Sequence, residues 1–351
     1  MLLYIHIPFC DSKCSYCAFN SYVDKFQLKE EYMLALHKQL LFELSRYEAK
    51  EQSIETLFIG GGTPSTVEPA LYAPLFKTLQ PYLKKNIEIT SEANPNSATK
   101  EWLQGMKALG VNRISFGVQS FDAEKLKLLN RAHTPTMAIE AIKSAKSLGY
   151  ENLSLDLIYA TLGDTKELLQ RDLQQALALP INHISAYALT IEEGTAFSSK
   201  PHMSKEQLEL TEWLFRAIAS HGFTQYEISN FGNYQSQHNL GYWTYKEYIG
   251  LGAGAVGKRA LKRYYPQKVI EKYIDNPLEI EEEQLTTEDE HIEKIFLGLR
   301  SCVGVAESLL SQKELAQAKI LLDEEKLTLV DGIYYNNDYL LADEIALFLT
   351  A

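Results

Sequence analysis

The stretch HIPFCDSKCSYCAFN, residues 6–20, decides the fold of this chain because it contains three cysteines at the spacing CxxxCxxC. They are Cys10, Cys14 and Cys17, whereas the fourth cysteine of the 351-residue chain, Cys302, lies near the other end. The run directly follows the apolar segment 2–7, which is typical of a buried strand. Three thiols on a loop after a strand indicate ligands for a metal centre.

Apolar runs alternate with amphipathic stretches over the first 200 residues. This alternation predicts strand–helix steps of a parallel sheet. Residues with distinctive chemistry follow the predicted strands, at the edge where parallel α/β folds carry their sites. Six steps are too few for a closed eight-stranded barrel, so we expect an open, partial barrel. We predict strands at 2–7, 54–62, 86–95, 112–120, 152–160 and 183–190, and helices at 28–47, 68–83, 98–109, 122–130, 136–148 and 166–178.

The pattern changes after residue 200, and the chain divides into expected domains at 1–200, 201–280 and 281–351. The middle part predicts a helix at 205–223, a strand at 224–232 and an aromatic, glycine-rich passage. Its GxGxxG match, Gly252, Gly254 and Gly257, lacks a clean βαβ unit, so we expect a tight loop and no dinucleotide site. The acidic run 279–290 is interpreted as a linker or helix start. The last part predicts a small, mainly helical, winged-helix-like domain with a hairpin at 327–336.

Composition limits the classes of function. The formal net charge of −12 argues against a general nucleic-acid or anionic-membrane surface. No segment approaches eighteen uninterrupted apolar residues, and the apolar N-terminus is too short for a span or signal peptide. The few cysteines and their odd cluster predict a reducing, cytoplasmic location.

The cysteine cluster leaves two kinds of metal centre open. A structural zinc site needs four ligands, which His6 or Cys302 would have to complete. A four-iron cluster takes thiolate ligands, and three of them leave one iron open for another molecule. Cys302 is expected to be a buried, small apolar residue and no ligand.

The CxxxCxxC motif with Tyr16 before its last cysteine resembles the signature of the radical S-adenosylmethionine (SAM) superfamily. The motifs YIHIPFC, GGGTPS, EANP, ISFGVQSF, LNRAH, LDLIY, HNLGYW and YIGLGAGA together resemble the oxygen-independent coproporphyrinogen III oxidase (HemN-like) group over nearly the whole chain. The resemblance implies a partial (β/α)6 barrel with a [4Fe-4S] cluster held by Cys10, Cys14 and Cys17. It also implies SAM bound to the open iron.

The resemblance also implies roles for further residues. Taken without the resemblance, each of these residues could also have a structural role alone. Glu92, for example, is equally typical of a helix cap or a salt bridge. By resemblance, Gly61, Gly62 and Thr63 contact SAM, Glu92 hydrogen-bonds it and Tyr4 belongs to the same site. In the oxidases, a second SAM site is lined by positions that match Tyr16, Thr63, Gln119, Arg131 and Asp156.

Three features distinguish two subgroups of this family. The oxidases extend the cysteine motif to CxxxCxxCxC and have an N-terminal extension, whereas this chain has Phe19 at the extra position and begins its first strand at Leu2. The run HNLGYW, residues 238–243, matches the HNxxYW motif of the HemW subgroup of haem chaperones. His238 is either a packed, hydrogen-bonded histidine or an axial haem ligand.

The sequence therefore predicts a HemW-type protein that binds haem and delivers it to apoproteins, as a monomer or as a cluster-dependent dimer. The alternatives are an oxygen-independent coproporphyrinogen III oxidase, which would decarboxylate two propionates by radical chemistry, and a structural zinc protein.

Overall fold

A computed structural model describes all residues, 1–351, and six parallel strands form its centre. These strands pair in chain order, and β6 does not return to β1, so the barrel is open as predicted. Except at the exposed start of β3 and at Tyr187 on β6, their side chains are mostly buried on both faces, as expected for a parallel sheet covered by helices. The strands are β1 (Leu2–Ile7), β2 (Ile54–Gly61), β3 (Leu83–Ala93), β4 (Arg113–Gln119), β5 (Asn152–Tyr159) and β6 (His183–Ala188).

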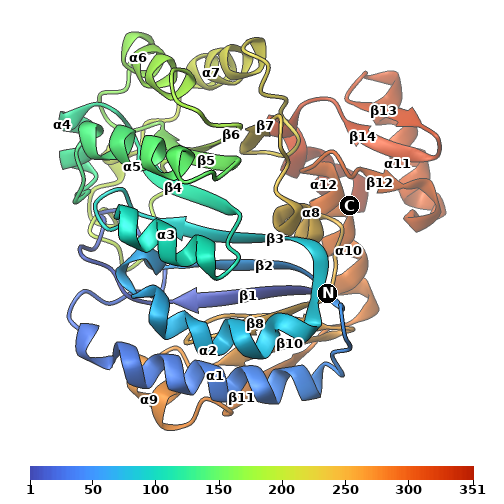
Figure 1. Cartoon of the computed structure of the whole chain (residues 1–351). Helices are drawn as coiled ribbons and strands as arrows, with labels where there is room; N and C mark the ends of the chain where they lie inside the picture. Colours follow the sequence, from blue (N-terminus) through green and yellow to red (C-terminus); the bar gives the residue numbers. More distant parts are fainter.

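Six helices cover the outer face of these strands (Figure 1). Side-chain N-caps start several of them; Thr99, Asp122, Thr134 and Thr165 each accept a hydrogen bond from the backbone N–H three residues later. The predicted helix 68–83 is shorter, because a 3-10 turn at Gln80–Tyr82 follows it and β3 already begins at Leu83. The helices are α1 (Lys29–Arg46), α2 (Pro69–Leu79), α3 (Lys100–Ala108), α4 (Ala123–Leu128), α5 (Pro135–Ser147) and α6 (Lys166–Leu177).

Both edges of the central sheet are extended by the middle part of the chain. A short strand, β7, pairs antiparallel with β6, and β8 pairs parallel with β1, so the full sheet has 11 strands. The run with three glycines forms the turn between β8 and β9, and no dinucleotide-type βαβ unit follows, as predicted. The elements are α7 (Leu208–Ser220), β7 (Asn230–Gly232), α8 (Gln237–Trp243), β8 (Tyr248–Leu251), β9 (Gly257–Arg259), β10 (Lys262–Pro266), α9 (Ile270–Asp275) and β11 (Ile280–Gln284).

Two expectations for this part were right only in part. The stretch 224–232 forms a strand only over its last three residues. The acidic run 279–290 was expected as a linker or helix start; its last four residues do begin α10, but its first part forms the strand β11. Its glutamates pair with cations of the antiparallel neighbour β10: Lys262 contacts Glu282 at 2.8 Å, and Arg263 contacts Glu283 at 3.7 Å. Opposite charges across the pair stabilise a strand that its own residues disfavour.

The last part of the chain forms a separate lobe with its own hydrophobic core of 11 buried residues (Figure 1). The predicted hairpin is present, and its two turn residues, Asp331 and Gly332, both have positive φ angles, as a tight hairpin requires. The lobe contains α10 (Thr287–Leu299), β12 (Val305–Ala306), α11 (Gln312–Asp323), β13 (Leu327–Val330), β14 (Ile333–Asn336) and α12 (Ala342–Thr350).

The larger core, of 56 buried residues, includes side chains from residues 214–273 as well as from the barrel. The three-part domain division stays a prediction, with the middle part packed into the barrel core. Cys302 was expected to be buried, and this was wrong. It is exposed in the turn after α10, where its backbone N–H donates to Tyr226 and its side chain is left at the surface. None of the helices combines the length and apolar composition that a membrane-spanning helix requires.

Candidate functional site

Most predicted site residues face one cavity of about 450 Å³ at the carboxyl ends of the central strands. The sheet brings them together because the loops after β1 to β5 leave the same edge. Of the thirteen predicted residues, only Tyr4 and His238 lie outside it. The other eleven line the cavity: Cys10, Cys14, Tyr16, Cys17, Gly61, Gly62, Thr63, Glu92, Gln119, Arg131 and Asp156.

The cysteine loop is fixed at both of its ends. The backbone N–H of Cys10 donates to Tyr22, and the N–H of Tyr22 donates back to Pro8, which closes the loop beside β1. The Thr63 hydroxyl donates to the Cys10 sulfur at 3.3 Å. Burial raises the pKa of the Cys10 and Cys17 thiols. We therefore expect these thiols to be protonated until a metal binds and displaces the protons.

The donor set fits an iron–sulfur cluster better than a single zinc ion. No three His, Cys, Asp or Glu side chains are arranged to hold one ion. Neither proposed fourth zinc ligand lines the cysteine cavity: His6 faces another cavity, and Cys302 faces neither. A Cβ on Gly62 would lie 3.0 Å from the Cys10 sulfur and 2.9 Å from the Ile7 carbonyl, so only glycine lets the chain pass this close to the thiol.

Two carboxyl groups, those of Glu92 and Asp156, line the same cavity. Gly61, at φ +109°, turns its N–H toward Glu92 and donates to the carboxylate at 3.1 Å. Burial, and then the charge of Asp156, raise the pKa of Glu92 to about 8. Burial also raises the pKa of Asp156, which accepts a 3.4 Å hydrogen bond from Ser115. The pair is thus prepared to accept an incoming cation or hydrogen-bond donor.

Arg131 connects the cysteine loop to the strands. Its guanidinium donates to the Cys14 sulfur at 3.1 Å, to the Asn94 side chain at 2.7 Å and to the Gly117 carbonyl at 2.6 Å. Asn94 in turn donates to Thr63 at 3.0 Å. Sequence reasoning missed Asn94 as a site residue, although its place in the EANP motif was a signal. Gln119 lines the same cavity with a left-handed backbone, φ +68°, and its side-chain amide lies beside Gly117, as the Arg131 guanidinium does.

A second cavity, of about 710 Å³, holds the two remaining predicted residues, Tyr4 and His238. It runs along β1 between α8 and the β8–β9 turn, and aromatic rings form much of its wall. Phe58, Tyr248 and Lys268 also line it; Tyr248 stands first in the motif YIGLGAGA, whereas sequence reasoning gave no signal for Phe58 and Lys268. Lys13, Ala18, Phe19 and Ser21 line both cavities, so the cysteine loop is the wall between them.

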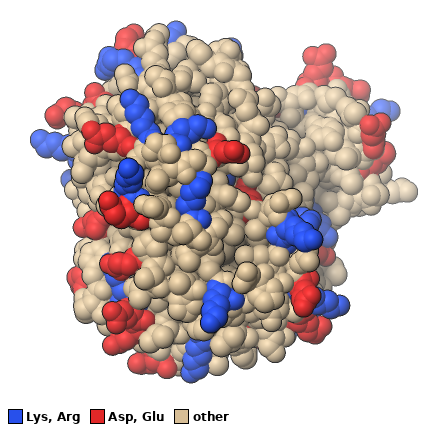
Figure 2. Space-filling model, in the orientation of Figure 1, with Lys and Arg blue, Asp and Glu red and all other residues tan.

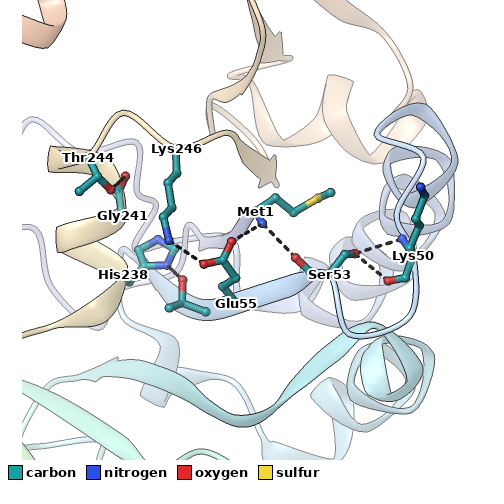
Figure 3. Close-up of polar contacts among 9 residues, drawn as sticks. Met1, Lys50, Ser53, Glu55, His238, Gly241, Thr244 and Lys246 are labelled. Carbon is teal, nitrogen blue, oxygen red and sulfur yellow. Dashed lines mark hydrogen bonds and ion pairs between the residues drawn. The ribbon is translucent and has the colours of Figure 1, made fainter. Parts of the chain in front are cut away.

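His238 lies on the short helix α8, beside Thr56 near the start of β2, whereas the cysteines follow the end of β1 (Figure 3). Its Nδ1 is 2.7 Å from the Thr56 hydroxyl, and its Nε2 is 3.0 Å from the Tyr242 hydroxyl. Burial, and then the charge of Arg113, lower its pKa to about 3. The imidazole is therefore neutral, and both ring nitrogens are hydrogen-bonded.

Comparisons with known proteins agree with this geometry. Residues 4–176 match the Radical SAM superfamily. "Heme chaperone HemW" of Bacillus subtilis is 34% identical over 88% of this chain and 86% of its own length, and its Escherichia coli counterpart is 37% identical over 80% and 78%. Among solved structures, coproporphyrinogen III oxidase (HemN) from Escherichia coli aligns with a TM-score of 0.83 at 19% identity, covering 99% of this chain and 89% of that one. That likeness establishes the shared fold. The identity to the chaperones over most of both chains shows that this chain belongs to the HemW family within the radical SAM superfamily.

Proposed function

We propose that this protein is a haem chaperone that holds a [4Fe-4S] cluster and SAM in the cysteine cavity and haem in the neighbouring 710 Å³ cavity. It passes the haem to apoproteins in a reducing cytoplasm. The observation that carries the proposal is the pair of cavities on the two sides of one loop. Membership of the HemW family, whose relatives are named heme chaperones, supports it.

The cysteine cavity suits the first two ligands. When bound, a cluster on Cys10, Cys14 and Cys17 would supply an open iron for SAM. The glycines after β2 leave room for a ligand beside the thiols. Glu92 offers a carboxyl group that can ionise when a cationic ligand binds, while Arg131 orients the Cys14 thiol.

The second cavity suits a flat, mainly apolar ligand. Its volume falls in the range of small-molecule sites. The Phe58 ring packs 5.2 Å from the His238 ring, and the Tyr242 and Tyr248 rings pack 4.9 Å apart at right angles. Such rings offer faces and edges against which a porphyrin can pack.

The alternative function, oxygen-independent coproporphyrinogen III oxidation, is supported by the intact SAM cavity. Phe19 argues against it, because the oxidases have a further cysteine at this position. The Phe19 side chain is 68% exposed and lines both cavities, so it places an apolar ring where that thiol would lie.

One anaerobic experiment separates the two functions. The protein is reconstituted with iron and sulfide and given reductant, SAM and coproporphyrinogen III, and the same preparation is titrated with haem. We expect one haem per chain and no protoporphyrinogen. Protoporphyrinogen formation at catalytic rates would establish the oxidase and reject the chaperone.

His238 as axial ligand has a test of its own, because Tyr242 occupies its Nε2. Ligation requires that hydroxyl to leave, while Thr56 keeps Nδ1 oriented, as a hydrogen-bond partner of a metal-bound histidine does. His238→Ala should therefore weaken haem binding and change the Soret band. Tyr242→Phe, which keeps the ring, should strengthen binding. If both variants bind haem like the unchanged protein, His238 is only a packed histidine.

A further inference from the structure

We propose that Lys13 and Lys268 bind the two propionate carboxylates of the ligand in the 710 Å³ cavity, so that this end of the cavity selects a porphyrin with free acid groups. This inference rests on the proposed haem-binding function and deepens it by naming the groups that recognise the ligand's charge.

The charge of the cavity wall differs from that of the chain as a whole. The chain has 46 acidic and 34 basic residues, but the 16 residues that line this cavity include two lysines and no aspartate or glutamate. Burial lowers the pKa of His6 and His238, so these histidines add no positive charge near neutral pH. The lining side chains therefore carry a local charge of +2, suited to a ligand with two negative groups.

Both lysines belong to the same end of the cavity. The Lys13 ammonium donates to the Phe19 carbonyl and the Ser21 hydroxyl, each at 2.7 Å. The side chain of Asn20, between those two residues, donates to the Lys268 carbonyl at 2.8 Å. This end is the loop that separates the two cavities, close to the mouth and to solvent.

The other end of the cavity is aromatic. Tyr248 pairs with Leu2 at the start of β1, and Tyr242 packs between Tyr248 and His238. The cavity thus follows β1 from a hydrophobic end to a cationic end. Haem has the same polarity, because its apolar ring edge lies opposite its two propionates.

Lys268 is the more available of the two cations. Its side chain is exposed and forms no hydrogen bond or ion pair within the protein, although its backbone carbonyl is held by Asn20 and Tyr22. Because the backbone of Lys268 is held in place while its ammonium group is unpaired, this group can bind a carboxylate without losing an existing hydrogen bond.

The test compares two probes on the full-length protein: haemin, with two free propionates, and haemin dimethyl ester, in which both are neutral. Lys268→Gln should weaken haemin binding by about two- to tenfold and leave ester binding unchanged. Lys272→Gln on α9 is the matched control, because this exposed lysine lies outside both cavities. Higher salt should weaken binding of haemin and not of the ester.

Lys13 also stabilises the cysteine loop through its hydrogen bonds, so loss of haemin binding in Lys13→Gln could come from a changed loop. We therefore compare Lys13→Gln with Lys13→Arg, which keeps the charge and should restore haemin affinity. Iron content after reconstitution shows whether the cysteine loop is intact in each variant. If Lys268→Gln binds haemin as tightly as Lys272→Gln does, the propionate assignment is wrong while haem binding stands. If the unchanged protein binds neither probe, the haem function fails and the assignment fails with it.

Discussion

The contribution of Glu92 to the free energy of unfolding depends on pH. Its pKa in the folded chain is raised to about 8, above that of the unfolded chain, because of burial and the nearby Asp156. The native state therefore binds a proton that the unfolded state has released between about pH 4.5 and pH 8. Over that interval the free energy of unfolding falls as pH rises, by at most about 1.4 kcal/mol per pH unit from this group.

Glu92→Gln should remove this dependence in the protein without cofactors. We expect the variant to be more stable than the parent at pH 8, with a difference that shrinks toward pH 5, as measured by urea unfolding. The same variant should bind SAM more weakly, because an amide, unlike the carboxyl group, cannot lose a proton when a cationic ligand binds beside it. Glu101→Gln, on the exposed face of α3, is the control. Equal pH slopes for the parent and Glu92→Gln would contradict the argument.

The exposed position of Cys302 gives a second prediction at this scale. Cys14→Ala should lose most of the iron bound after anaerobic reconstitution, because it removes a thiol that faces the cavity and accepts from Arg131. Cys302→Ala should keep it, because this thiol faces neither cavity. Iron and sulfide analysis per chain measures both. Iron loss in Cys302→Ala at preserved stability would mean that the fourth cysteine is a ligand.

The sequence predicted the residues of the cysteine cavity well, because each follows a strand and parallel strands end at one edge. Tyr4 and His238 show the limit of that rule. Tyr4 lies inside a strand, so its side chain faces the barrel interior, below the edge. His238 depends on where the seven-residue helix α8 docks, and that position is set by contacts with distant strands. The exposure of Cys302 likewise depends on the docking of the C-terminal lobe.

At the scale of elements, α8 shows how a helix too short to be stable alone is fixed in place. The Glu88 carboxylate on β3 accepts hydrogen bonds from the backbone N–H groups of Gln237 and His238, at 2.9 and 3.0 Å. The Tyr234 hydroxyl donates to the same carboxylate at 2.8 Å. The negative group thus satisfies the N–H groups that begin the helix and orients His238.

Glu88→Gln should therefore destabilise the protein by about 1–3 kcal/mol, because the amide NH₂ would replace one of two accepting oxygens inside a buried site. Haem affinity should fall as well, since His238 and Tyr242 are both carried by α8. Urea unfolding and haem titration measure the two effects. The control is Glu279→Gln, an exposed residue before β11. A variant with parental stability and haem affinity would show that Glu88 does not hold this helix.

The strands of the barrel were predictable as elements because each is a short apolar run between amphipathic helices. The acidic β11 was not, since its stability comes from cations on β10 and not from its own residues. The contacts of the Glu55 carboxylate were not predictable from the sequence either. Figure 3 shows that it lies between the Met1 amine and the Lys246 ammonium, so three segments that are distant in the sequence meet at one carboxylate.

At the scale of the whole molecule, the C-terminal lobe carries most of the net charge. Residues 287–351 contain 13 acidic and five basic side chains, and red residues outnumber blue ones over this lobe in Figure 2. A winged-helix-like unit with this charge is unsuited to a phosphate backbone, which supports the prediction of no nucleic-acid partner. The lobe is joined to the barrel by backbone hydrogen bonds of Ile228 to Arg300 and of Cys302 to Tyr226.

A buried carboxyl group lies at this junction. Glu227 is 1% exposed, its Oε1 has no hydrogen-bond partner, and its backbone pairs with Ser301 of the lobe. Burial raises its pKa to about 7. The neighbouring Tyr226, Tyr339 and Cys302 all have raised pKa values, so they stay neutral in the same range. Glu227 is therefore the group here that ionises near neutral pH.

Ionisation of Glu227 should weaken the attachment of the lobe. Because its pKa is higher in the folded chain than in the unfolded one, its contribution to stability is complete below about pH 4.5 and is lost as pH rises through 7. In Glu227→Gln, the backbone amides of Ile228 and Cys302 should stay protected from hydrogen exchange at pH 8. In the parent, the same amides should lose protection at pH 8, so that they exchange faster than the pH dependence of intrinsic exchange predicts. Glu307→Gln, on the surface of the lobe, should behave like the parent. If parent and Glu227→Gln protect these amides equally at pH 6 and pH 8, the junction does not respond to this carboxyl group, and the lobe is held by its packing alone.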